Sequence, residues 1–335
     1  MRLSSIARLG VSSVMPLLLL LSLFVSTGET AVPAEKVKVI WNALSGFTAP
    51  IWIGKEAGIY EKYGLDVDLQ YVPANTAIQA LISGDAPISQ VPPMSVVNAI
   101  LGGADLKLFI GAINTMAFSL MVSPEIKSIE DLRGKAIGVS QHGSSTDHAI
   151  RIALTKKWNM RPNKDVNILA MGDLAAIVAG LLGGKIQAGV IGPPQTLQAQ
   201  QAGFRELVDL GSLGLPYPHM GMATSTSTIR KNPELLRKYT KAFVESVKIF
   251  KTDKALSMRV IGKYNKITDP QILEASYEGN RYLEEVPYVK GVRESLGLLA
   301  EANSKALTAN ADEFIENRFV RELEESGFIK QVFGR

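Results

Sequence analysis

Apolar and polar positions from Val37 onward follow two periods, one typical of strands and one typical of helices. Short apolar runs predict strands at 37–41, 66–72, 86–91, 106–113 and 118–123. Segments of helical period lie between the first four of these strands, at 49–64, 75–84 and 94–103. This strand–helix order predicts an α/β domain with a largely parallel sheet.

A second series of the same kind begins at Pro124. It predicts strands at 136–140, 166–171, 187–192 and 204–210, with helices at 144–158, 173–184 and 194–203. Beyond 221–226 the chain is mostly helical. Crossings near 118–123 and 220–226 would give lobe 1 residues 35–120 and 222–335, and lobe 2 residues 121–221. Because ligands of open α/β sheets sit beyond the carboxyl ends of the strands, we expect a binding cleft between two lobes that close by hinge motion.

The first 34 residues have the pattern of a secretory signal peptide. Arg2 and Arg8 precede an apolar run from Val14 to Val25, and small residues follow at 32–34. A membrane anchor is the alternative, but that run is shorter than the about 20 residues of a spanning helix. We therefore expect residues 1–34 to be cleaved and the remaining chain to lie in the periplasm.

Composition and motifs argue against most catalytic classes. The chain has no cysteine, so a thiolate nucleophile or a cysteine-bound metal is excluded. The net charge of +4 is small and its basic residues are scattered, so we expect no nucleic-acid partner. The run at 180–186 lacks the residues of a phosphate loop, and the run at 142–146 lacks the second glycine of a nucleophile elbow. We expect a protein without enzymatic activity, cofactor or bound metal.

The stretch from Ile137 to Leu154, "IGVSQHGSSTDHAIRIAL", holds the first candidate site. His142, Gly143, Ser144 and Ser145 lie between a predicted strand and a predicted helix. Serine at a helix start leaves backbone N–H groups and a positive dipole end that bind anionic oxygens. The alternative is a helix cap that holds no ligand.

Lobe 1 offers a parallel arrangement and further candidates. Ser45, Gly46 and Phe47 also join a strand to a helix, although Phe47 could be a core residue instead. Other candidate side chains follow predicted strands or precede the second crossing near 220–226. Both places lie close to the expected ligand position. These additional candidate ligand-binding residues are Gln90, Met94, Asn114, Pro194 and His219.

Several segments, taken in order, resemble a known family. They are "APIWIGKEAGIYEKYGLDVDL", "ALISGDAPIS", "GADLKLFIGA", "SIEDLRGKAIGVSQHGSS" and "GKIQAGVIGPP". Together they are similar to periplasmic substrate-binding proteins of ABC transporters, in the nitrate/sulfonate/taurine (NMT1-like) group. That group shares its domain with pyrimidine-precursor binders and with a fungal thiamine-pyrimidine synthase. The resemblance covers roughly residues 37 to 250.

The resemblance implies a two-lobed type II periplasmic-binding fold with two hinge crossings and a small organic ligand between the lobes. It places the loop of Ser45 to Phe47 and the helix start at Gly143 to Ser145 around that ligand. It also implies a membrane permease as partner, and we expect a monomer. The pocket loops hold no arginine, so nitrate is disfavoured, and an anionic sulfonate or carboxylate or a heterocycle is expected. An enzyme of the same fold and a receptor for a histidine kinase are the alternatives.

Overall fold

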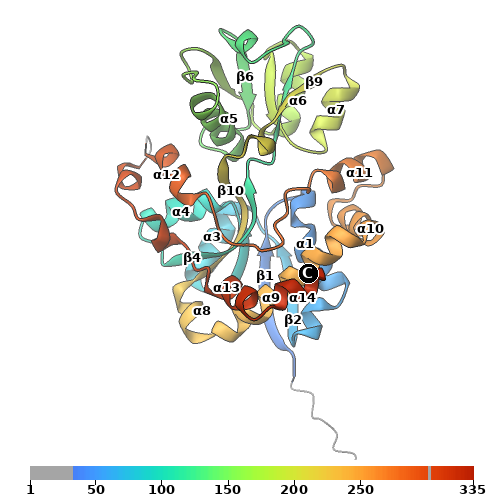
Figure 1. Cartoon of the computed structure of the whole chain (residues 1–335), viewed down its shortest axis with the longest axis vertical. Helices are drawn as coiled ribbons and strands as arrows, with labels where there is room; N and C mark the ends of the chain where they lie inside the picture. The colour runs from blue at the N-terminus through green and yellow to red at the C-terminus, as the bar shows by residue number, and fades with distance from the viewer. Residues whose placement is uncertain (1–32, 301–302) are drawn as a thin grey trace, which may run out of the picture. The chain divides into compact units, whose positions relative to one another are not determined.

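The computed structural model describes residues 33–300 and 303–335, and Ala34–Arg335 form one compact unit. The predicted signal peptide lies outside the described residues except for its last two positions. The unit contains two five-stranded sheets with helices against them (Figure 1). The chain is therefore an α/β protein with two lobes, as the sequence pattern predicts. Within the described ranges, no helix is long and apolar enough to cross a bilayer.

Lobe 1 is built on the sheet of strand order β2-β1-β3-β10-β4. Its strands are β1 (Glu35–Trp41), β2 (Leu65–Tyr71), β3 (Ile88–Val91), β4 (Leu106–Thr115) and β10 (Pro216–Ser225). The helices of its first half are α1 (Ala49–Glu56), α2 (Ile59–Lys62), α3 (Ala74–Ser83) and α4 (Pro93–Leu101). The sequence pattern predicts one helix over 49–64, and this is wrong in one respect. Gly58 adopts a left-handed conformation at φ 66°, which ends α1 and starts α2 in a new direction.

The helical end of the chain completes lobe 1. Its α-helices are α8 (Thr226–Lys231), α9 (Pro233–Thr252), α10 (Lys254–Asn265), α11 (Pro270–Glu278), α12 (Val292–Leu299), α13 (Arg318–Glu325) and α14 (Phe328–Phe333). The longest, α9, starts at Asn232, whose side chain accepts from the backbone N–H of Leu235. Its buried face packs on α1, and large apolar side chains such as Trp52 and Phe243 are fully enclosed there. Burying such aromatic rings supplies much of the free energy that holds this lobe together.

Lobe 2 is built on the sheet of strand order β7-β6-β8-β5-β9. Its strands are β5 (Ser119–Val122), β6 (Ala136–Val139), β7 (Asn167–Ala170), β8 (Ala188–Ile191) and β9 (Arg205–Asp209). Its α-helices are α5 (Ser145–Lys156), α6 (Leu174–Leu182) and α7 (Gln195–Gln201). Figure 1 shows α5 on one side of this sheet and α6 and α7 on the other.

Both sheets are largely parallel, as the sequence pattern predicts, and each contains one antiparallel strand that the pattern does not predict. The strand β10 runs antiparallel to β3 and β4, and β5 runs antiparallel to β8 and β9. Each of these two strands enters its sheet from the other lobe. Such a strand enters at the carboxyl ends of the neighbouring parallel strands, because those ends face the other lobe. It therefore runs antiparallel to them.

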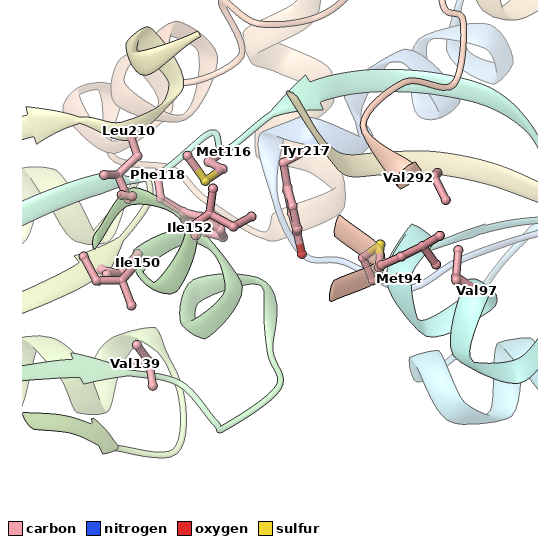
Figure 2. Close-up of a cluster of buried hydrophobic side chains, with 14 of the residues drawn as sticks. Met94, Val97, Met116, Phe118, Val139, Ile150, Ile152, Leu210, Tyr217 and Val292 are labelled. Atoms are coloured by element: carbon pink, nitrogen blue, oxygen red, sulfur yellow. The ribbon is translucent and has the colours of Figure 1, made fainter. Parts of the chain in front are cut away.

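The chain passes between the sheets after β4 ends at Thr115 and again after β9 ends at Asp209. The lobe boundaries expected from the sequence, 120/121 and 221/222, lie inside β5 and β10. Side chains of the two crossings belong to a buried apolar cluster that also includes residues of α5 (Figure 2). The labelled members from the crossings are Met116, Phe118 and Leu210, and those from α5 are Ile150 and Ile152.

Candidate ligand-binding site

The principal cavity lies where the carboxyl ends of strands from both sheets face one another. Its volume is about 700 Å³, within the range of small-molecule sites. Lobe 1 supplies the segments that follow β1 and β3, and lobe 2 supplies those that follow β7 and β8. The sequence-predicted residues that line it are Ser45, Phe47, Gln90, Ser145, Pro194 and His219.

The loop after β1 is held by its own polar side chains. Ser45 precedes a 3₁₀ turn (Gly46–Thr48), and its Oγ accepts from the backbone N–H of Phe47 at 3.3 Å. The Thr48 hydroxyl lies 2.9 Å from the carbonyl oxygen of Ala43 and 3.3 Å from Oε1 of Gln90. The Thr48 contact occupies one polar atom of the buried Gln90 amide, so the other atom of that amide is the part left to bind a ligand.

His219 lies on β10 with its ring among aromatic side chains. The rings of Phe47 and Phe118 meet it edge to face, at centroid distances of 5.0 and 4.8 Å. Burial lowers the pKa of His219 to about 4, because the charged imidazolium would lose its hydration there. The ring is therefore neutral near pH 7. Its buried Nδ1 has no hydrogen-bond partner among the described residues.

Asn42, directly after β1, has a second unsatisfied group beside the cavity. Its Nδ2 is buried and has no partner among the described residues. A buried polar atom without a partner costs free energy, so these two groups are places where a small movement of the lining would gain a hydrogen bond.

The cavity has almost no charge. Its lining contains no lysine and no arginine, and Asp173 is the charged residue on it. Oδ1 of Asp173 caps α6 by accepting from the backbone N–H of Ala176 at 2.8 Å. An anion in this cavity would meet a carboxylate and no formal positive charge, which makes its desolvation costly.

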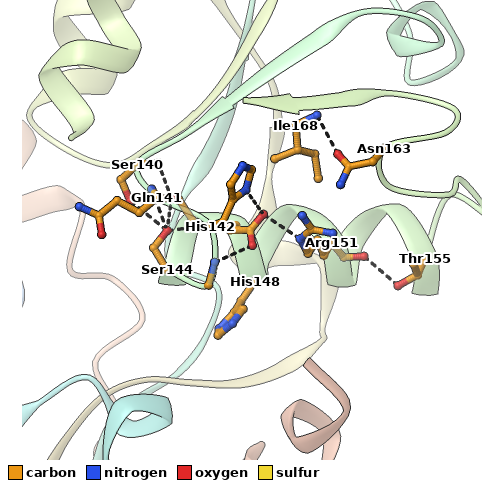
Figure 3. Close-up of polar contacts among 12 residues, drawn as sticks. Ser140, Gln141, His142, Ser144, His148, Arg151, Thr155, Asn163 and Ile168 are labelled. Carbon is orange, nitrogen blue, oxygen red and sulfur yellow. Dashed lines mark hydrogen bonds and ion pairs between the residues drawn. The ribbon is translucent and has the colours of Figure 1, made fainter. Parts of the chain in front are cut away.

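The helix start at Ser144 is capped by the chain itself. Its Oγ accepts from the backbone N–H of Asp147 at 3.4 Å, and the carboxylate of Asp147 accepts from Gly143 N at 2.9 Å (Figure 3). Arg151 donates to the same carboxylate at 2.8 Å. The positive end of the α5 dipole, which we expected to be free to bind an anion, is thus largely compensated by an acidic side chain in the first turn of the helix.

Met94, His142, Gly143 and Ser144 line a smaller compartment rather than the principal cavity. Its volume is about 320 Å³, and it shares Ser145 with the larger one. The adjacent His148 is buried, and burial lowers its pKa. Its Nδ1 lies 3.2 Å from the Tyr217 hydroxyl, which places this imidazole in the interior between α5 and β10.

The remaining two sequence-predicted residues lie away from both spaces. Gly46 packs on the C-terminal segment: a side chain there would lie 2.4 Å from the Ser276 carbonyl oxygen. Asn114 is buried and joins β4 to a later loop. Its amide donates to the Tyr288 carbonyl at 2.8 Å and accepts from Lys290 N at 3.0 Å.

Several lining residues were not predicted from the sequence, although a usable signal exists for them. Asn42 follows β1, Tyr71 ends β2, Asp173 follows β7 and Gln195 follows β8. All four lie at the carboxyl edge of a sheet, where the topological rule places ligands. Among the described residues, no cluster of three or more histidine and acidic side chains could hold a metal ion.

Comparison with known proteins gives a consistent result. The family described as NMT1/THI5 like matches residues 47–253. A candidate binding protein of Brucella abortus strain 2308 is 28% identical over 263 residues, which cover 74% of this chain and 79% of that protein.

Solved structures share the fold at low sequence identity. The periplasmic aliphatic sulphonate binding protein from Escherichia coli matches with a TM-score of 0.68 and 18% identity, covering 84% of this chain and 92% of that one. The periplasmic nitrate-binding protein from Synechocystis PCC 6803 matches with a TM-score of 0.63 and 16% identity, covering 88% and 89%. The chain therefore has the two-lobed periplasmic-binding-protein fold.

Proposed function

This chain belongs to the NMT1/THI5-like family, and from that premise we propose that it is the periplasmic solute-binding component of an ABC importer. It would capture a small organic molecule between its lobes and deliver it, unaltered, to a membrane permease. The relatives support this role, since they include a candidate binding protein and, among the solved structures, periplasmic binding proteins for sulphonate and for nitrate. The observation that carries the proposal is the cavity of about 700 Å³, which is lined by segments of both lobes.

The lining favours a neutral heterocycle over an ionised sulfonate or carboxylate. The rings of Phe47, Phe118 and His219 offer apolar faces, and Asn42 and Gln90 place amide side chains in the lining. An anion would need a compensating cation or free helix N–H groups. Among the described residues, the lining holds no lysine and no arginine. Side chains cap the 3₁₀ turn after Ser45 and the starts of α5 and α6, whereas the starts of α4 and α7 have no side-chain cap.

The ligand class is tested by titration calorimetry of the chain from residue 35 onward. The probes are cytosine and uracil as neutral heterocycles, and taurine, ethanesulfonate and benzoate as charged alternatives. We expect a heterocycle to bind and Asn42→Ala to weaken it about tenfold, since one hydrogen bond to an uncharged partner is lost. Asn98→Ala, in the smaller compartment, is the matched control and should leave the affinity unchanged. Tight binding of ethanesulfonate with no heterocycle bound would refute the ligand class.

The transport role needs a separate experiment. The permease and ATPase are reconstituted in proteoliposomes, and ATP hydrolysis is measured with and without this protein and its ligand. We expect the liganded protein to stimulate hydrolysis. Native mass spectrometry of the purified protein should recover any bound molecule chemically unaltered. Recovery of a reaction product in place of the bound molecule would contradict a pure binding role.

A further inference from the structure

The short segment from Ser276 to Tyr282, at the end of α11 and just beyond it, contacts both lobes behind the cavity. We call it the interlobe segment. On lobe 1 it supports the loop of Gly46, where a Cβ would lie 2.4 Å from both the Ser276 carbonyl oxygen and Asn280 Nδ2. The neighbours of Gly46 on either side, Ser45 and Phe47, line the cavity. One cavity loop therefore rests directly on this segment.

On lobe 2 the same segment touches the second cavity loop. Gly279 lies against Pro193, and a Cβ at Gly279 would be 2.4 Å from Cγ of that proline. Pro193 and the two residues that follow it line the cavity. The approach is so close that only a hydrogen fits between the backbone of Gly279 and the proline ring.

The segment is also fixed to the second crossing between the lobes. Tyr282 packs against Gly211, where a Cβ would lie 2.5 Å from its ring. The Tyr282 hydroxyl and the Arg281 guanidinium both donate to Oδ2 of Asp209, the last residue of β9. A further contact joins α7 to α11 nearby, where Gln201 Nε2 lies 3.3 Å from Gln271 Oε1. Figure 1 shows α11 extending toward the lobe that carries α7.

We propose that the interlobe segment is a spacer that sets the separation of the two cavity loops, with Gly46 and Gly279 as its positioning residues. It touches both loops on the side away from the ligand space, through contacts too close to compress. Packed surfaces of this kind shift as rigid bodies rather than deform, so added volume at Gly279 moves one lobe against the other. The relevance of the interlobe segment to ligand selection rests on the proposed function, but its effect on the separation of the lobes does not.

The test measures an interlobe distance in the ligand-free protein. Because the chain has no cysteine, Lys185→Cys on lobe 2 and Lys231→Cys on lobe 1 give two unique sites for nitroxide labels. Pulsed electron spin resonance then reports the distance distribution between them. We expect Gly279→Ala to shift the distribution while the far-UV spectrum and Tm stay near those of the unmutated protein. Gly297→Ala is the matched control, since nothing lies within 4 Å of a Cβ there.

A second variant covers the case in which Gly279→Ala does not fold. Arg281→Gln combined with Tyr282→Phe removes the two donors to Asp209 without adding volume, and it should broaden the distance distribution. A folded Gly279→Ala protein with an unshifted distance distribution would overturn the proposal. It would mean that the interlobe segment moved to accept the methyl group while the two lobes kept their separation. An unbroadened distribution in the double variant would overturn it as well if Gly279→Ala is unfolded. Neither result depends on which ligand the cavity takes.

Discussion

Replacing His219 by phenylalanine should remove an acid-sensitive part of the stability of this protein. In the folded chain, burial lowers the pKa of His219 from 6.5 to about 4. Between these two values the unfolded chain binds a proton at this position and the folded chain does not. Stability is therefore complete above pH 6.5 and falls as the pH drops toward 4, with no further loss from this group below that.

The shift sets the size of the effect. It corresponds to at most about 3 kcal/mol of unfolding free energy, and water in the adjoining cavity reduces this, so we expect a loss of about 1 to 3 kcal/mol. The phenylalanine ring keeps the edge-to-face contacts with Phe47 and Phe118 but cannot take a proton. The unfolding free energy of the His219→Phe protein should therefore fall less on acidification than that of the unmutated protein.

The assay is urea unfolding of both ligand-free proteins at intervals between pH 7 and pH 4. Carboxylates and the buried His148 titrate in both proteins, so their contributions cancel in the difference between the two curves. Histidine NMR signals followed through the same range would report the pKa of His219 directly. Parallel stability curves, or an imidazole that titrates near 6.5, would refute the assignment of a neutral, buried ring.

Three further substitutions test the structural roles assigned above, each by urea unfolding at pH 7. Asn114→Ala should cost about 2 to 3 kcal/mol, because it leaves Lys290 N and buried carbonyls without partners, and it should not change ligand affinity; a loss below about 0.5 kcal/mol would contradict this role. Asp147→Asn should cost about 1.5 to 3 kcal/mol through its lost charge pair with Arg151, and an unchanged free energy would show that the pair is not formed in solution. Gly54→Ala should cost about 1 to 3 kcal/mol, since its Cβ would lie 2.6 Å from a buried tyrosine ring; a neutral effect would mean that the ring moves freely.

Prediction from sequence was most successful where one element determines the outcome. The alternation of strand and helix periods located the strands of both lobes, including β5 within the predicted segment 118–123. The loop of Ser45 to Phe47 was expected at the ligand space because it joins a strand to a helix, and Ser45 and Phe47 do line the cavity. Their role in ligand binding stays a prediction.

Prediction was weakest where several elements meet. Asn114 follows a strand, as a pocket amide would, yet its bonds go to a loop about 170 positions further along the chain. That outcome does not follow from local pattern, because it depends on a partner whose position the rest of the fold decides. The helix start at Ser144 was expected to attract an anion, but Asp147 three positions later and Arg151 four beyond that compensate it within the helix, a local signal that the prediction did not use.

The sequence by itself determined the two α/β series, the two crossings and the family resemblance, because periodicity and strand-to-helix turns act over neighbouring residues. Only the tertiary structure decided that, among the described residues, the cavity lining has no lysine or arginine and Asn42 Nδ2 has no partner, and that His219 is neutral. It alone brought the segment of Gly279 behind both cavity loops. Burial, charge and close contact are properties of segments that are far apart in sequence and adjacent in space, and for that reason they appear only when the chain is folded.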